Sequence, residues 1–110
     1  MWFVFPQIAG LGQSETSRKY AIASRAEACA YLENQSLGPR LLECARTLEV
    51  SRALSATEIL GPVDARKLQS CMTLFMRAAP GEPQFARVLE RYFAGMPDRN
   101  TDRLLQARGD

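Results

Sequence analysis

Apolar residues recur at helical spacing along most of the chain after residue 24. The clearest pattern lies in residues 64–79, where apolar side chains fall at i, i+3, i+4 and i+7, the spacing of a helix that buries one face. This stripe consists of Leu68, Cys71, Met72 and Phe75. Residues 41–48 and 83–94 repeat the pattern. No segment alternates apolar and polar residues over the length of a strand, so we predict no sheet.

Residues that favour helix starts precede these stripes. The words "SRAE" (Ser24–Glu27) and "SATE" (Ser55–Glu58) are capping boxes, in which a hydroxyl and a carboxylate bond the first free amides of a helix. Pro39 suits the first turn of a helix, where its missing N–H is not needed. We expect Asp64 to cap the clearest helix and Asn100 to cap a last short helix.

Residues that typically end helices follow the apolar stripes. They are Gly61, Pro80 with Gly81, and Gly95. The pattern therefore predicts an all-α fold, a single compact bundle of about five or six short-to-medium helices. We expect one helical domain over residues 1–110, with residues 101–110 frayed at the end of the chain.

Composition and charge narrow the class of protein. A chain of 110 residues that is 46% hydrophobic can bury one core. Its net charge is +2 and its basic and acidic residues are interleaved, so it lacks the basic stripe of a nucleic-acid-binding protein.

The opening apolar run, Met1 to Phe5, is too short for a secretory signal, and no stretch reaches the roughly 20 apolar residues of a membrane span. We predict a cytoplasmic protein that binds neither nucleic acid nor membranes.

The chain has three cysteines and no histidine. An odd number of widely spaced cysteines (Cys29, Cys44 and Cys71) argues against a disulfide framework and a zinc site. The absence of histidine excludes Ser-His-Asp, Cys-His and zincin arrangements. We therefore expect buried thiols, no metal and no cofactor.

Two groups of residues have the chemistry of a site. Aromatic side chains gather in the first third of the chain, at Trp2, Phe3, Phe5, Tyr20 and Tyr31. They either form core, the more common role of such a cluster, or line a pocket with Gln7 and Tyr20 as its polar points.

The second group is the helix face with Asp64, Lys67, Ser70 and Cys71. A lysine beside a serine or cysteine can form a base and nucleophile, because a nearby cation lowers the pKa of a thiol. The alternative, which we favour, is an ion pair between Asp64 and Lys67, with Ser70 at the edge of the core and Cys71 inside it.

Four words in the chain resemble a known bacterial family. They are "MWFVFPQIAGLGQS" (followed by Tyr20), "LGPRL", "KLQSCMTLF" and "RYFAG". Together they resemble domain of unknown function family 1810, whose members are sometimes labelled calpastatin. The resemblance implies a small, soluble, mainly helical protein without an established activity. It also implies an N-terminally shortened chain, because family members carry about one more helix before the first word.

The resemblance points to candidate ligand-binding positions within the family's words. These are Gln7, Ser14, Tyr20, Lys67, Ser70 and Thr73, with Trp2 as their aromatic neighbour. The "AGLGQS" word lacks the third glycine of a dinucleotide fingerprint, so we interpret it as a turn that leads to Ser14 as a helix cap. The family usually has a serine where this chain has Cys71, which puts a chemical role of that position in doubt.

Three functions follow from these observations. The first is a non-enzymatic binding or accessory domain that recognises a small molecule or a protein. The second is an enzyme whose pocket lies between the N-terminal aromatic segment and the Lys67 helix, with Lys67 as base or electrostatic clamp and Ser70 as donor. The third is a structural or interaction protein that forms a homodimer through the apolar surface of Met1 to Phe5. No residue is assigned a catalytic role.

Overall fold

The computed structural model describes residues 5–11, 21–51, 55, 58 and 60–107. The described residues form five helices, which confirms the prediction of an all-α bundle. They are α2 (Arg25–Glu33), α3 (Leu37–Glu49), α5 (Pro62–Ala78), α6 (Gln84–Phe93) and α7 (Arg99–Ala107). The radius of gyration of 12.7 Å is close to the ~13 Å expected of a compact domain of this size.

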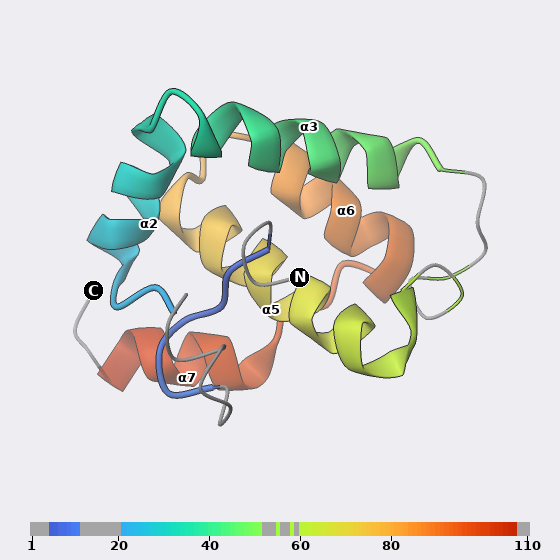
Figure 1. Ribbon diagram of the computed structural model, residues 1–110. Coiled ribbons are helices and arrows are strands. Elements are labelled where there is room, and N and C mark those ends of the chain that lie inside the picture. The colour runs from blue at the N-terminus through green and yellow to red at the C-terminus, as the bar shows by residue number, and fades with distance from the viewer. Residues whose placement is uncertain (1–4, 12–20, 52–54, 56–57, 59, 108–110) are drawn as a thin grey trace.

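Helix α5 is the centre of the bundle (Figure 1). It packs against α2, α6 and α7, while α3 packs against α2 and α6. The predicted apolar stripe of α5 is fully buried, and the Phe75 ring packs at a tilt against those of Tyr31 of α2 and Phe85 of α6, at centroid distances of 5.4 and 5.7 Å. Tyr31 and the buried Phe5 therefore serve the core, as the favoured interpretation of the aromatic residues predicted.

The extended segment 5–11 crosses α5 and reaches α7 (Figure 1). It forms one isolated parallel bridge, in which the Ala9 N–H donates to the Ile22 carbonyl at 2.7 Å and the Ile22 N–H donates to the Gln7 carbonyl at 2.8 Å. Phe5, Ile8 and Ile22 are buried in the core. Backbone pairing and apolar burial thus fix this segment, although the described part of the chain contains no strand.

Most predicted helix signals are confirmed. The Ser24 hydroxyl accepts the Glu27 N–H at 3.1 Å, and the Glu27 carboxylate accepts the N–H of Ala23 at 3.3 Å. The Ser55 hydroxyl accepts the Glu58 N–H at 3.0 Å. Pro39 lies in the first turn of α3, and Gly95 follows the end of α6.

Two predicted caps are wrong. Helix α5 begins at Pro62, with Gly61 as its N-cap, because proline suits the first helical position; Asp64 lies within the first turn. The cap of α7 is Asp98, whose Oδ2 accepts the Thr101 N–H at 2.9 Å, and Asn100 lies inside the helix. Residues 101–107, which we expected to fray, belong to α7, where Thr101 and Leu105 are buried.

Candidate functional site

The structure brings together two parts of the predicted site, segment 5–11 and α5. The Gln7 Nε2 donates to the Ser70 hydroxyl at 2.7 Å, and this hydroxyl donates to the Lys67 carbonyl oxygen at 3.1 Å. Gln7 is 8% exposed and Ser70 1% exposed, so Ser70 lies in the core rather than at its edge. A buried amide needs such a partner, because an unsatisfied one costs about 1–3 kcal/mol. We call this hydrogen bond the Gln7–Ser70 contact.

Lys67 lies one turn before Ser70 on α5, and its side chain is partly exposed. Its Nζ is 3.5 Å from the Asp64 Oδ1, which confirms the predicted ion pair. The two side chains are 17% and 38% exposed, so this pair stays accessible to water. The lysine charge at this position is therefore balanced by a carboxylate of its own helix.

Cys71 is fully buried, and this burial raises the pKa of its thiol. A nucleophilic cysteine needs the opposite shift, toward the thiolate. The interpretation of Cys71 as a nucleophile activated by Lys67 is therefore wrong, and its interpretation as a core residue is confirmed.

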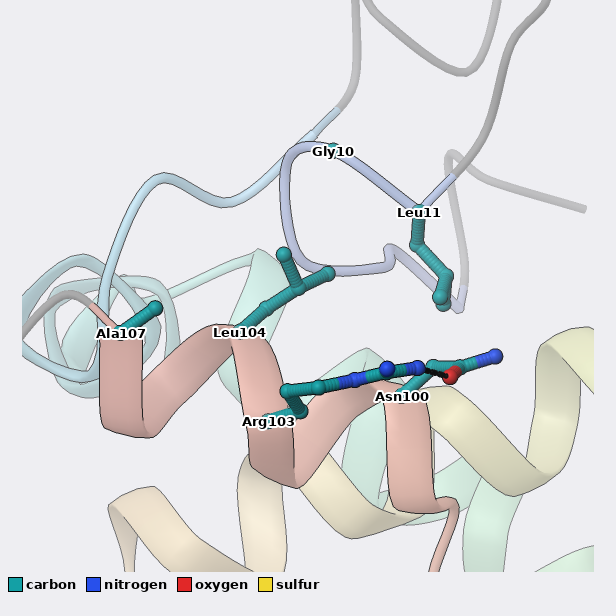
Figure 2. A pocket seen from close by; sticks show the side chains of 6 residues that line it. All are labelled: Gly10, Leu11, Asn100, Arg103, Leu104 and Ala107. Carbon is teal, nitrogen blue, oxygen red and sulfur yellow. Dashed lines mark hydrogen bonds between the residues drawn. The ribbon is translucent and has the colours of Figure 1, made fainter.

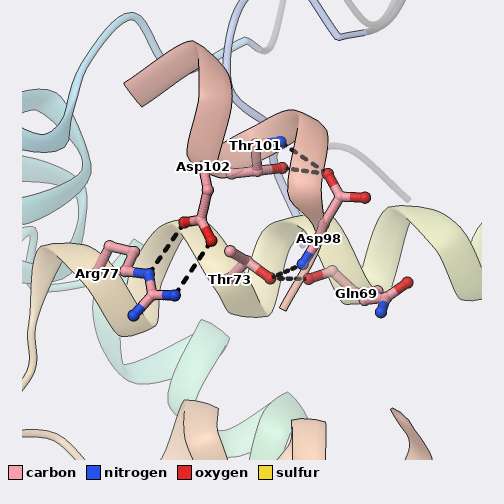
Figure 3. Close-up of polar contacts among 6 residues, drawn as sticks. All are labelled: Gln69, Thr73, Arg77, Asp98, Thr101 and Asp102. Carbon is pink, nitrogen blue, oxygen red and sulfur yellow. Dashed lines mark hydrogen bonds and ion pairs between the residues drawn. The ribbon is translucent and has the colours of Figure 1, made fainter. Parts of the chain in front are cut away.

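Thr73 joins α5 to the start of α7 (Figure 3). Its hydroxyl donates to the Gln69 carbonyl at 2.8 Å and accepts the Asp98 N–H at 2.8 Å. The Asp98 carboxylate in turn accepts both the N–H and the hydroxyl of Thr101, at 2.9 and 2.7 Å. Both hydrogen-bonding functions of the Thr73 hydroxyl are thus used within the fold.

An ion pair fixes the next turn of α7 on α5 (Figure 3). The Arg77 Nε and Nη2 donate to the two oxygens of Asp102, at 3.0 and 3.1 Å. This bidentate contact raises the pKa of Arg77. Helix α7 is therefore held at a fixed position relative to α5.

Trp2, Ser14 and Tyr20 lie outside the described residues, and their placement in the site stays a prediction. The same holds for the homodimer through Met1 to Phe5, of which the structure describes Phe5. Among the described residues, no helix has the length and apolar character to cross a membrane. That part of the chain also contains no group of three or more Cys, Asp or Glu side chains able to hold a metal ion.

A hollow of about 320 Å³ that is open to solvent lies between the end of segment 5–11 and α7 (Figure 2). We call it the α7 cavity; its lining residues are Gly10, Leu11, Asn100, Arg103, Leu104 and Ala107. Gly10 has a φ of 96°, a left-handed conformation that favours glycine, and its turn brings Leu11 over α7. In Figure 2 the Leu11 and Leu104 side chains reach into the space, and the Arg103 side chain lies along α7.

Sequence reasoning missed the α7 cavity, apart from the turn at Gly10. Its two walls are about ninety residues apart in the chain, and no local pattern joins them. One signal was present, since the half-buried Leu104 follows the exposed Arg103 on α7 and places an apolar side chain beside a charged one.

A second cavity, of about 300 Å³, lies between α3 and the start of α6. Its lining residues are Leu42, Glu43, Arg46, Glu82 and Gln84. Two carboxylates surround the single guanidinium there, and Gln84 donates to the Glu49 carboxylate at 2.6 Å. This composition resembles an ordinary charged surface more than a ligand site.

The comparisons with known proteins agree with this fold. A model of the family "Protein of unknown function (DUF1810)" matches residues 1–105. The chain belongs to the DUF1810 family. This DUF1810 protein is also similar to a solved structure, the conserved hypothetical protein Rv1873 from Mycobacterium tuberculosis, with 47% sequence identity and a TM-score of 0.93. The similarity covers 96% of this chain and 75% of that chain. The comparison with curated proteins found no match.

Proposed function

We propose that this DUF1810 protein is a non-enzymatic domain that binds a small molecule in the α7 cavity. The observation that carries the proposal is the composition of the cavity walls. Leu11, Leu104 and Ala107 supply apolar surface, while Asn100 and Arg103 supply a few polar groups. A mostly apolar hollow of about 300–1,000 Å³ with few polar groups is typical of small-molecule sites.

The anchoring of both cavity walls supports this function. Segment 5–11 is attached to α5 through the Gln7–Ser70 contact, and α7 is attached to α5 through Thr73–Asp98 and Arg77–Asp102. Walls that are fixed before binding lower the entropic cost of ordering a site around its ligand. The predicted residues Gln7, Ser70 and Thr73 would then serve binding by positioning these walls.

The chemistry of the candidate groups favours binding over catalysis. The Cys71 thiol is buried and held in its protonated form, and Lys67 is paired with Asp64. Ser70 uses its hydroxyl as both donor and acceptor inside the fold. An enzyme using Lys67 and Ser70 would need an activated nucleophile or base, and these contacts supply none.

The same proposal places the protein in a bacterial cytoplasm. Its three cysteines are free thiols, as in proteins of a reducing compartment. The family relative of solved structure comes from a bacterium.

An NMR titration with a library of small carboxylates, alcohols and amines tests the proposed function. We expect amide shift changes at residues 10–11 and 100–107. Ala107→Trp should fill the cavity and abolish them. Gln106→Trp is the matched control, because Gln106 is also exposed on α7 but does not line the cavity. Shift changes confined to residues 42–46 and 82–84, or none with any compound, would contradict the proposal.

A further inference from the structure

We infer that the α7 cavity selects a small monocarboxylate with a short apolar chain, an inference that rests on the proposed function. Charge is the first argument. Arg103 carries the single charge among the six lining residues, so the charge that a ligand meets at this wall is positive. A guanidinium keeps its positive charge at neutral pH and matches the geometry of a carboxylate.

The neighbouring carboxylates of α7 are engaged elsewhere. Asp102 forms the bidentate pair with Arg77, and Asp98 accepts the N–H and hydroxyl of Thr101. Neither acid lines the cavity. The charge of Arg103 is therefore directed to a ligand rather than neutralised by its own helix.

Asn100 sets the orientation of the guanidinium. Its Oδ1 accepts a hydrogen bond from the Arg103 Nη2, one turn along α7, and the side chain extends beneath Leu11 (Figure 2). This bond uses one of the five N–H donors of a guanidinium. Among the described residues, the Arg103 guanidinium has no second hydrogen-bond partner. Its other N–H groups can therefore donate to the two oxygens of a carboxylate.

The apolar walls and the volume of the cavity determine the length and the apolar character of the chain that the ligand carries. Leu11 and Leu104 face each other across the space, with Ala107 at its end (Figure 2). A volume of about 320 Å³ holds about ten water-sized groups, since the share of one water in the liquid is ~30 Å³. A chain of about four to eight carbons fits this space. One guanidinium balances a monoanion, whereas a phosphate dianion needs further donors.

Calorimetry and NMR with four compounds of equal chain length test the inference: hexanoate, hexanol, hexylamine and hexyl phosphate. We expect hexanoate to bind at least about tenfold more tightly than hexanol and hexylamine, as one charge-assisted contact provides. Hexyl phosphate should bind no more tightly than hexanoate.

Variants then assign the selectivity to Arg103. Arg103→Gln should weaken hexanoate binding about tenfold and leave hexanol binding unchanged, and Arg103→Lys should fall between. Arg87→Gln, which removes an exposed arginine of α6, is the control of equal charge and should have little effect.

The outcomes separate this inference from the proposed function. Equal binding of hexanol and hexanoate, tighter binding of hexyl phosphate, or an unaltered Arg103→Gln variant overturns the inference while the binding function stands. Absence of binding by every compound, at residues 10–11 and 100–107 alike, overturns both.

Discussion

Gln7 and Leu11 lie four residues apart in one extended segment, but they meet the bundle in opposite ways. Gln7 is buried and donates to Ser70, and its neighbour Ile8 is fully buried in the core. Leu11 is half-buried and extends over the α7 cavity. One short segment therefore contains both an anchor, at Gln7 and Ile8, and a wall of the cavity, at Leu11. Changes at the anchor should alter stability, and changes at the wall should alter binding.

We expect the largest change in stability from truncating Ile8, and truncation of Leu11 in the same segment is the comparison. Ile8→Ala should lower the free energy of unfolding by about 2–5 kcal/mol, because it leaves a void in a close-packed core. Leu11→Ala should lower it by less than about 1 kcal/mol, because a half-buried leucine contributes only part of its burial energy. Urea denaturation measures both. Equal losses would remove the distinction between anchor and wall.

The Gln7–Ser70 contact gives the next largest effect. Ser70→Ala leaves the buried Gln7 amide without this acceptor, and we expect a loss of about 1–3 kcal/mol in the free energy of unfolding. Thr47→Ala is the control, since Thr47 also bonds a carbonyl of its own helix but is exposed. A Ser70→Ala loss no larger than the Thr47→Ala loss would show that the contact does not anchor the segment.

The cap of α7 should contribute about 1 kcal/mol, the usual value for an aspartate cap. Asp98→Ala removes the acceptor of two Thr101 hydrogen bonds and loosens the second wall of the cavity. Asp64→Ala is matched to it, because Asp64 was expected from the sequence to be a cap but forms only a surface pair, worth about 0.3–0.5 kcal/mol. Thermal unfolding of the two variants checks the order; a larger effect at Asp64 would reverse it.

A change of pH near neutrality should have the smallest effect on the free energy of unfolding. Burial raises the pKa of Cys71 in the folded state, so its contribution is complete below the unfolded value near 9.0 and is lost as pH rises through the folded pKa. Stability should therefore stay constant between about pH 7 and 8 and decline above about pH 9, less so in Cys71→Ala. Hexanoate binding should not follow this decline while the protein is folded, because Cys71 does not line the cavity. Denaturation and calorimetry across this range test both statements.

The helices could be predicted from the sequence because their signals are local. The stripe of α5 and the capping box at Ser24–Glu27 each lie within a few turns. The error at the start of α7 has a non-local cause: Asp98 and Asn100 are both good caps by residue type, and the choice between them depends on the contact between the Thr73 hydroxyl and the Asp98 N–H. Sequence patterns alone do not show this contact.

The candidate site was only partly predictable for the same reason. Gln7 and Ser70 were both singled out, although nothing in the sequence joins two residues 63 positions apart. Leu11, Arg103 and Leu104 meet because α7 is attached to α5 by Thr73 and Arg77. Their individual residue types are ordinary for a turn and a surface helix, so the cavity exists only in the folded protein.

A crystal structure of the protein soaked with hexanoate would show whether the α7 cavity binds a carboxylate. We expect the carboxylate within hydrogen-bonding distance of the Arg103 guanidinium, the alkyl chain between Leu11 and Leu104, and an intact Gln7–Ser70 contact. A cavity closed by direct packing of Leu11 on Leu104, or hexanoate bound at another place on the molecule, would contradict it.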